Sequence, residues 1–126
     1  MNISAKASAF EQGTLDAAGF SHRDHIAVAI GLSQRYSFTK AAHLYASRID
    51  AMARAAGAPD KFNTTITLAF LGLIAERMQT TPHEDFDTFL DRNTDLLDRS
   101  VLSRWYGTER LTSDLAKRVF LLPDPA

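Results

Sequence analysis

Two histidines spaced for one helix face are the residues of this chain best suited to chemistry. His22 and His25 are three positions apart, so on a helix they project from the same side. Neutral imidazole binds zinc, iron, copper or nickel, and it exchanges protons near neutral pH. The pair is therefore a candidate for catalytic proton transfer or for a transition-metal site. In the structural alternative, each ring only bonds a carbonyl or a carboxylate in the core.

A metal site would need further ligands, because two imidazoles do not complete the coordination of a transition metal. The sequence offers four side chains that could supply them if the fold brought them close. These are Asp24, Asp50, Asn63 and Glu76. The spacing of His22 and His25 does not match the metalloprotease pattern His-Glu-x-x-His.

A second polar group opens a predicted helix later in the chain. Asn63 and Thr67 are four positions apart, with Thr64 between them. Asn63 or Thr64 would ordinarily cap the helix. In the functional alternative, Asn63, Thr64 and Thr67 are ligand-binding residues that line a polar pocket beside the histidines. Free amide groups at such a helix start can hold an anion or a carboxylate.

Local capping signals predict the two helices on either side of residue 37. Ser21 with Asp24 resembles a capping box and predicts a helix over about 22–36. Ser37 can cap a following helix over about 38–56. Apolar residues at alternating spacings of three and four give that helix one apolar stripe. The stripe consists of Phe38, Ala42, Tyr45, Ile49, Met52 and Ala56.

The central element is predicted to be a helix over about 63–79. Gly57 and Pro59 end the preceding helix, because glycine adopts a left-handed stop and proline cannot continue a helix. The stretch 66–75 is apolar almost all round, which is typical of a buried helix. We therefore expect an all-α fold, an irregular bundle of five to six helices around this buried helix.

The rest of the chain is expected to complete one helical domain over residues 1–126. Ala, Gly and weak periodicity predict an irregular lead-in over 1–20. The Thr-Pro-His-Glu sequence at 81–84 predicts a helix start. Further helices are expected to about 91, over about 96–106, and over about 112–120, followed by a tail at 121–126.

Composition excludes some classes of function. The 126 residues carry 14 basic and 15 acidic side chains for a net charge of -1, which provides no field for nucleic-acid binding. The absence of cysteine excludes thiolate metal sites and cysteine nucleophiles. The chain has no long apolar run of the kind that would predict a signal peptide or a membrane span. We expect a cytoplasmic protein without nucleic-acid or membrane partners.

Two patches resemble a group of small bacterial proteins. Residues 20–26, Phe-Ser-His-Arg-Asp-His-Ile, resemble that group's Phe-x-His-x-x-His helix start. Residues 57–67, Gly-Ala-Pro-Asp-Lys-Phe-Asn-Thr-Thr-Ile-Thr, resemble its Gly-Ala-Pro-x-Lys-Tyr-His-x-Thr-x-Thr segment. The resemblance implies a third histidine where this chain has Asn63, and three histidines would suit a metal. It implies no activity.

Two hypotheses of function follow. In the first, a polar ligand or metal site lies between the helices at 22–36 and 63–79 and uses the two histidines with Asn63, Thr64 and Thr67. In the second, the histidines are structural and the protein is a non-catalytic interaction module or accessory subunit. Trp105, Tyr106 and the leucine-rich C-terminal segment would then meet a partner or form a homodimer. The sequence does not decide whether the protein is an enzyme.

Overall fold

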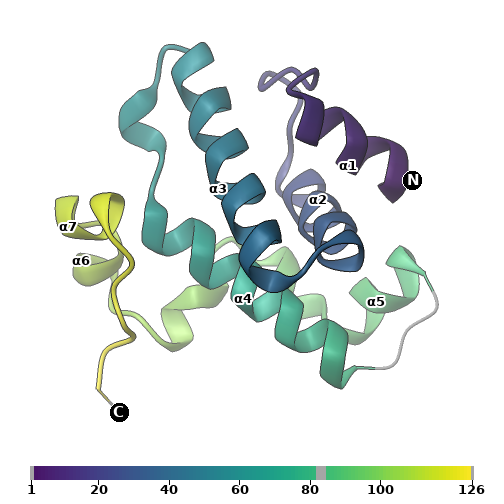
Figure 1. Ribbon diagram of the computed structural model, residues 1–126. Helices are drawn as coiled ribbons and strands as arrows, with labels where there is room; N and C mark the ends of the chain where they lie inside the picture. The colour runs from purple at the N-terminus through teal and green to yellow at the C-terminus, as the bar shows by residue number, and fades with distance from the viewer. Residues whose placement is uncertain (1, 82–84, 126) are drawn as a thin grey trace.

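The computed structural model describes residues 2–81 and 85–125, and all regular structure within them is helical (Figure 1). The expected all-α bundle is confirmed. In chain order the elements are α1 (Ile3–Gln12), α2 (His22–Arg35), α3 (Phe38–Ala55), the 3-10 turn η1 (Pro59–Lys61), α4 (Thr64–Thr80), α5 (Phe86–Arg92), η2 (Thr94–Leu97), η3 (Val101–Arg104), α6 (Thr108–Leu111) and α7 (Asp114–Arg118). No helix within the described ranges is both long and apolar enough to cross a membrane.

The expected irregular lead-in over 1–20 is wrong, because residues 3–12 form α1. The Asn2 side chain accepts a hydrogen bond from the Ala5 amide, and Gly13 ends the helix with a φ of 76°. Ala7 and Phe10, three positions apart, are fully buried. The sequence signal for this helix was weak because one of its two buried residues is Ala7. The burial of Ala7 depends on its close contact with Gly31 in α2.

The capping predictions for α2 and α3 are confirmed. The Ser21 hydroxyl accepts from the Asp24 amide while the Asp24 carboxylate accepts from the Ser21 amide, a complete capping box. Ser37 caps α3 through the Lys40 amide. The continuous run 26–32 of α2 is buried. The stripe of α3 is buried only in part, since Phe38 remains 50% exposed at its start.

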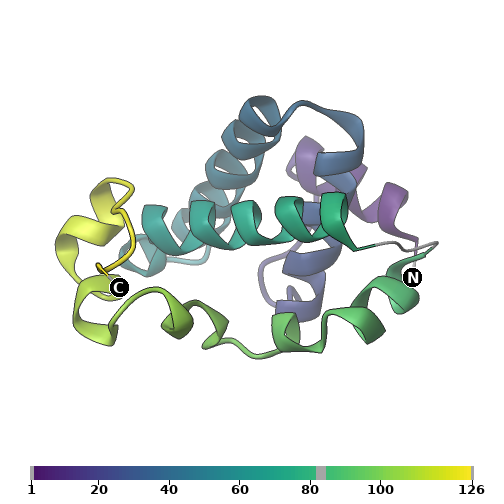
Figure 2. The ribbon, with the colours of Figure 1, turned by 90° about the horizontal axis from the view of Figure 1, so that it is seen from below.

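α4 is the central element of the bundle and contacts α2, α3, α7 and η3. Figure 2 shows it crossing the molecule, with the segment after α5 running back along it. Thr67, Phe70, Leu71 and Ile74 give it one buried face, and Thr65 on the opposite side is buried against the C-terminal segment. Its other face, around Gly72, is only partly covered.

The C-terminal third departs from the predicted helices. The expected start at 81–84 falls partly outside the described residues, and α5 begins at Phe86 with Asp85 as its cap. In place of a helix over 96–106 there are two 3-10 turns, η2 and η3. The Asp98 carboxylate accepts from the amide and hydroxyl of Ser100. Such local side-chain bonds compete with a continuous helix.

The helix expected over 112–120 is present as the shorter α7, and α6 precedes it at residues where the sequence predicted no helix. The Ser113 hydroxyl accepts from the Ala116 amide and donates to the Arg110 carbonyl, so it separates the two. Val119 has an extended backbone, and no regular element follows it up to residue 125. The Thr65 hydroxyl binds this segment at the start of α4, and the Thr64 hydroxyl donates to the Lys117 carbonyl in α7.

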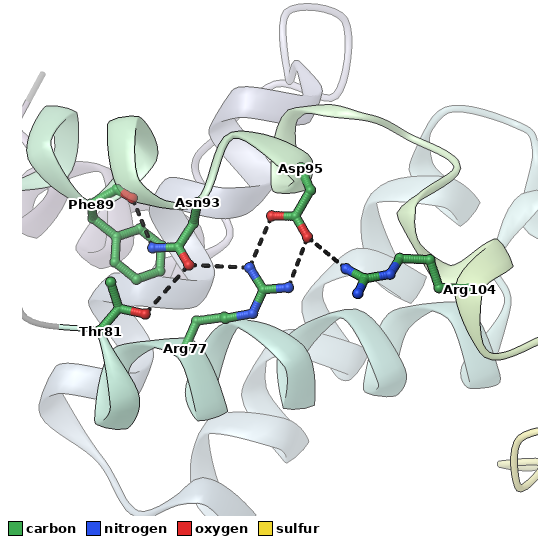
Figure 3. Close-up of polar contacts among 6 residues, drawn as sticks. All are labelled: Arg77, Thr81, Phe89, Asn93, Asp95 and Arg104. Atoms are coloured by element: carbon green, nitrogen blue, oxygen red, sulfur yellow. Dashed lines mark hydrogen bonds and ion pairs between the residues drawn. The ribbon is translucent and has the colours of Figure 1, made fainter.

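A polar cluster fastens the irregular segment 93–104 to α4 (Figure 3). The Arg77 guanidinium donates to both carboxylate oxygens of Asp95, at 2.9 and 2.7 Å, and to the side-chain oxygen of Asn93. Arg104 donates to the same carboxylate. The bond from Arg77 holds the pKa of Asp95 below its usual range. The cluster takes the place of the helical packing predicted here.

Replacing Arg77 with methionine is expected to lower the free energy of unfolding by about 1–2 kcal/mol. Methionine keeps the stem of the side chain but removes the bidentate bond to Asp95. Urea denaturation measures the loss, and Arg54→Met is the control. Arg54 makes an exposed bond to Asp50 within one helix, so that variant should lose much less. Equal losses would contradict a stabilising role for the cluster.

Candidate functional site

A cavity of about 350 Å³ lies between α2, α3, α4 and η3. We call it the His25 cavity. Its polar lining consists of His22, His25, Tyr45, Lys61, Asn63, Thr67 and Arg99, and its apolar lining of Phe20, Ile49, Phe62, Ile66, Phe70 and Leu102. The fold thus brings four of the five predicted site residues to one cavity. Thr64 does not line it.

His22 is anchored to the backbone. Its Nε2 atom lies 2.8 Å from the Leu96 carbonyl oxygen. A carbonyl only accepts hydrogen bonds, so Nε2 carries the proton and donates. The ring also packs against Phe70, with 5.2 Å between ring centroids. His22 therefore ties α2 to η2 and has only its Nδ1 atom left for a ligand.

His25 has no hydrogen-bond partner within the described residues, although its ring is largely buried. It packs edge-on against Phe20 at 4.5 Å. Burial and, to a lesser extent, the charges of His22 and Arg99 lower the pKa of His25 to about 4, while Asp24 opposes them. The imidazole is therefore neutral at pH 7 and offers the cavity one donor and one acceptor nitrogen.

Tyr45 is a functional candidate that the sequence placed only in an apolar stripe. Its side chain lines the His25 cavity and is 1% exposed. No described residue hydrogen-bonds its hydroxyl. Burial raises the pKa of Tyr45 above the ordinary range, so the group remains a donor at all physiological pH values. The Tyr45 hydroxyl is not fully enclosed by protein atoms, since among the described residues only the Ser33 hydroxyl is both buried and without a hydrogen-bond partner.

The predicted ligand-binding residues at the start of α4 are engaged within the protein. The side-chain oxygen of Asn63 accepts from the Ile66 amide, and its nitrogen donates to the Leu111 carbonyl. The Thr67 hydroxyl donates to the Asn63 carbonyl, and Thr64 donates to the Lys117 carbonyl. The capping alternative therefore holds for Asn63, and Thr64 binds the C-terminal segment instead of a ligand pocket.

The carboxylates considered as further metal ligands do not line the His25 cavity. Asp24 pairs with Lys6 and completes the α2 cap. Asp50 pairs with Arg54, and Glu76 lines a separate groove. Within residues 2–81 and 85–125, no group of three or more His, Cys, Asp or Glu side chains is placed to hold a metal. The cavity itself supplies two imidazoles.

Two cations at the cavity were missed by sequence reasoning. Lys61 and Arg99 line it, and neither side chain has an ion pair or hydrogen bond with a described residue. Lys61 stands two residues before the Asn63 cap, and this position predicts that its side chain lies near the start of α4. Arg99 carried no such signal, because nothing in the neighbouring sequence predicts that it approaches α2.

The depressed pKa of His25 makes a prediction about stability. In the unfolded chain the imidazole takes up a proton near pH 6.5, whereas folded His25 does so only near pH 4. Unfolding is therefore increasingly favoured as pH falls through that window, by up to about 3 kcal/mol. His25→Gln should remove this dependence, and His43→Gln, at an exposed position, should retain it. Urea midpoints at several pH values test this, and an unchanged dependence in His25→Gln would contradict it.

Comparison with family models, with curated proteins and with solved structures finds no match for this chain. The resemblance carried by residues 20–26 and 57–67 therefore stays a prediction. The functional argument rests on the geometry of the His25 cavity.

Proposed function

We propose that this protein is a small-molecule-binding domain whose ligand occupies the His25 cavity. The observation that carries the proposal is that Tyr45, which is 1% exposed, lines the cavity and has no hydrogen-bond partner among the described residues. The neutral imidazole of His25 is a second polar group that lines the cavity without a hydrogen-bond partner among the described residues. A bound molecule would satisfy both groups, and apolar side chains around them would enclose its body.

Binding is favoured over proton transfer and over metal chemistry. A general base works best when its pKa is close to the working pH, and the pKa of His25 is about 4. His25 is therefore a weak base at neutral pH, although it remains a competent hydrogen-bonding group. A transition metal would meet only His22 and His25, while structural zinc sites use four ligands and catalytic sites three.

The proposal is tested by titrating the protein with indole, a neutral two-ring probe, and following the His25 ring signals by NMR. Saturable shifts are expected in the wild-type protein. Ile66 lines the cavity and is 37% exposed, so Ile66→Trp should fill the space and abolish the shifts. Leu97→Trp, at an exposed position outside the cavity, should retain them. Binding that leaves His25 unmoved, or no binding, would overturn the proposal.

A second candidate function is self-association through a groove on the opposite side of α4. This Gly72 groove has a volume of about 560 Å³ and is mostly apolar. Phe38, Trp105 and Phe120 line it and are 50, 38 and 46% exposed. A Cβ built on Gly72 would have no atom within 4 Å. A hollow at Gly72 and protruding aromatic rings lie on the same face. This arrangement suits an isologous dimer, in which both subunits use the same surface.

Sedimentation equilibrium tests this candidate. A concentration-dependent dimer is expected for the wild-type protein. Gly72→Leu should shift it to monomer by filling the hollow, whereas Leu97→Lys, outside the groove, should not. A wild-type protein that remains monomeric at high concentration would reject the homodimer.

A further inference from the structure

Charge around the His25 cavity is one-sided. Its titratable lining residues are His22, His25, Tyr45, Lys61 and Arg99, and no aspartate or glutamate of the described residues lines it. Two carboxylates that interact electrostatically with the histidines are engaged elsewhere. Asp24 pairs with Lys6, and Asp98 binds the amide and hydroxyl of Ser100. A cationic ligand would therefore meet the like charges of Lys61 and Arg99 and no carboxylate of the described residues.

The cations at the cavity are not used by the fold. Lys6, Arg23, Arg35, Arg54, Arg77, Arg104 and Arg110 each pair with a carboxylate. Lys61 and Arg99 have no such partner among the described residues. The start of α4 adds positive potential at the cavity because its first turn contains no acidic residue, whereas Asp24 offsets the start of α2.

The remaining lining suits a flat apolar body. Phe20, Phe62 and Phe70 contribute rings, and Ile49, Ile66 and Leu102 contribute aliphatic surface. From these features together we infer that the ligand is an organic anion, with its acidic group held by Lys61, Arg99 and the Tyr45 hydroxyl and an aromatic body among the phenylalanines. Hydrogen bonds between charged partners are the strong ones in such a site. This inference rests on the proposed binding function and names the ligand class.

A matched series of three probes tests the ligand class: 2-naphthoate, 2-naphthylmethanol and 2-naphthylmethylammonium. They share one ring system and differ in charge. The dissociation constant of naphthoate is expected to be about tenfold lower than that of the alcohol, and the ammonium should bind least. Naphthoate should also raise the pKa of His25, because a nearby anion favours imidazolium. NMR signals of His25 report both effects.

Variants test whether Lys61 and Arg99 cause the preference for naphthoate. Lys61→Gln/Arg99→Gln should weaken naphthoate binding to the level of the alcohol. Arg92→Gln/Arg118→Gln removes the same charge from exposed positions outside the cavity and should preserve the preference. Equal binding of the three probes at His25 would overturn the anion class while the binding function stands. If none of the probes, nor indole, perturbs His25, the binding function itself fails.

Discussion

Replacing Gly31 with alanine is expected to lower the free energy of unfolding by about 1–3 kcal/mol. A Cβ at this position would lie 2.6 Å from the Cβ of Ala7 and 3.1 Å from Cγ2 of Ile3. The Ala7 Cβ is attached directly to the backbone, so α1 itself would have to move away from α2. Gly31 does not have a positive φ, so the cost comes from packing and not from backbone strain.

Gly72→Ala provides the matched control, because it makes the same change in the middle of another helix. A Cβ at Gly72 meets no atom within 4 Å. Alanine is the better helix former by about 0.5–1 kcal/mol, so this variant should be more stable than the wild type. Urea denaturation of both variants measures the two effects. If Gly31→Ala were no less stable than the wild type, the close contact of α1 with α2 would be wrong.

A double-mutant cycle locates the cost of Gly31→Ala. Ala7→Gly alone removes a buried methyl group and should destabilise α1. In the Gly31→Ala background the same change removes the clash and should be less harmful or even stabilising. The coupling free energy between positions 7 and 31 reports their contact directly. Additive effects would show that Gly31 is required for some other reason.

Thr65→Val is expected to cost about 2–4 kcal/mol, because it deletes two buried hydrogen bonds without changing side-chain size. The Thr65 hydroxyl donates to the Val119 carbonyl at 2.7 Å and accepts from the Leu121 amide at 3.0 Å. Thr65 is fully buried and Leu121 is 9% exposed. Valine would leave both backbone groups unsatisfied and loosen the extended C-terminal segment from α4.

Hydrogen exchange at the Leu121 amide, together with urea denaturation, measures the effect of Thr65→Val. Exchange should accelerate strongly in this variant. Thr64→Val is the control, since it removes a single bond to the Lys117 carbonyl from a half-buried position. It should cost less and leave Leu121 protected. Protection of Leu121 that survives Thr65→Val would contradict the role of this hydroxyl.

The sequence by itself determined the starts of the three long helices. Ser21, Ser37 and Asn63 each accept a hydrogen bond from an amide three residues ahead. Such a cap involves only neighbouring residues, so composition and spacing suffice to predict it. The candidate site was partly predictable for the same reason. His22, His25 and Asn63 lie at helix starts that meet across the bundle, and this places them at one cavity.

Only the tertiary structure decided the roles of those residues. His22 and His25 look equivalent in sequence, yet one bonds the Leu96 carbonyl and the other faces the cavity without a partner. Leu96 is 74 positions from His22, and no local pattern specifies that distance. Arg99 reaches the cavity because the segment after α5 forms 3-10 turns fastened to Arg77, where periodicity predicted a helix.

The same distinction explains α1. Its burial comes from the fit of Ala7 against Gly31, two small residues whose side chains give no hydrophobic signal of their own. Caps and apolar stripes are properties of adjacent residues. Close packing, buried polar partners and the charge lining a cavity depend on segments that are distant in the chain, and these are settled only when the helices meet.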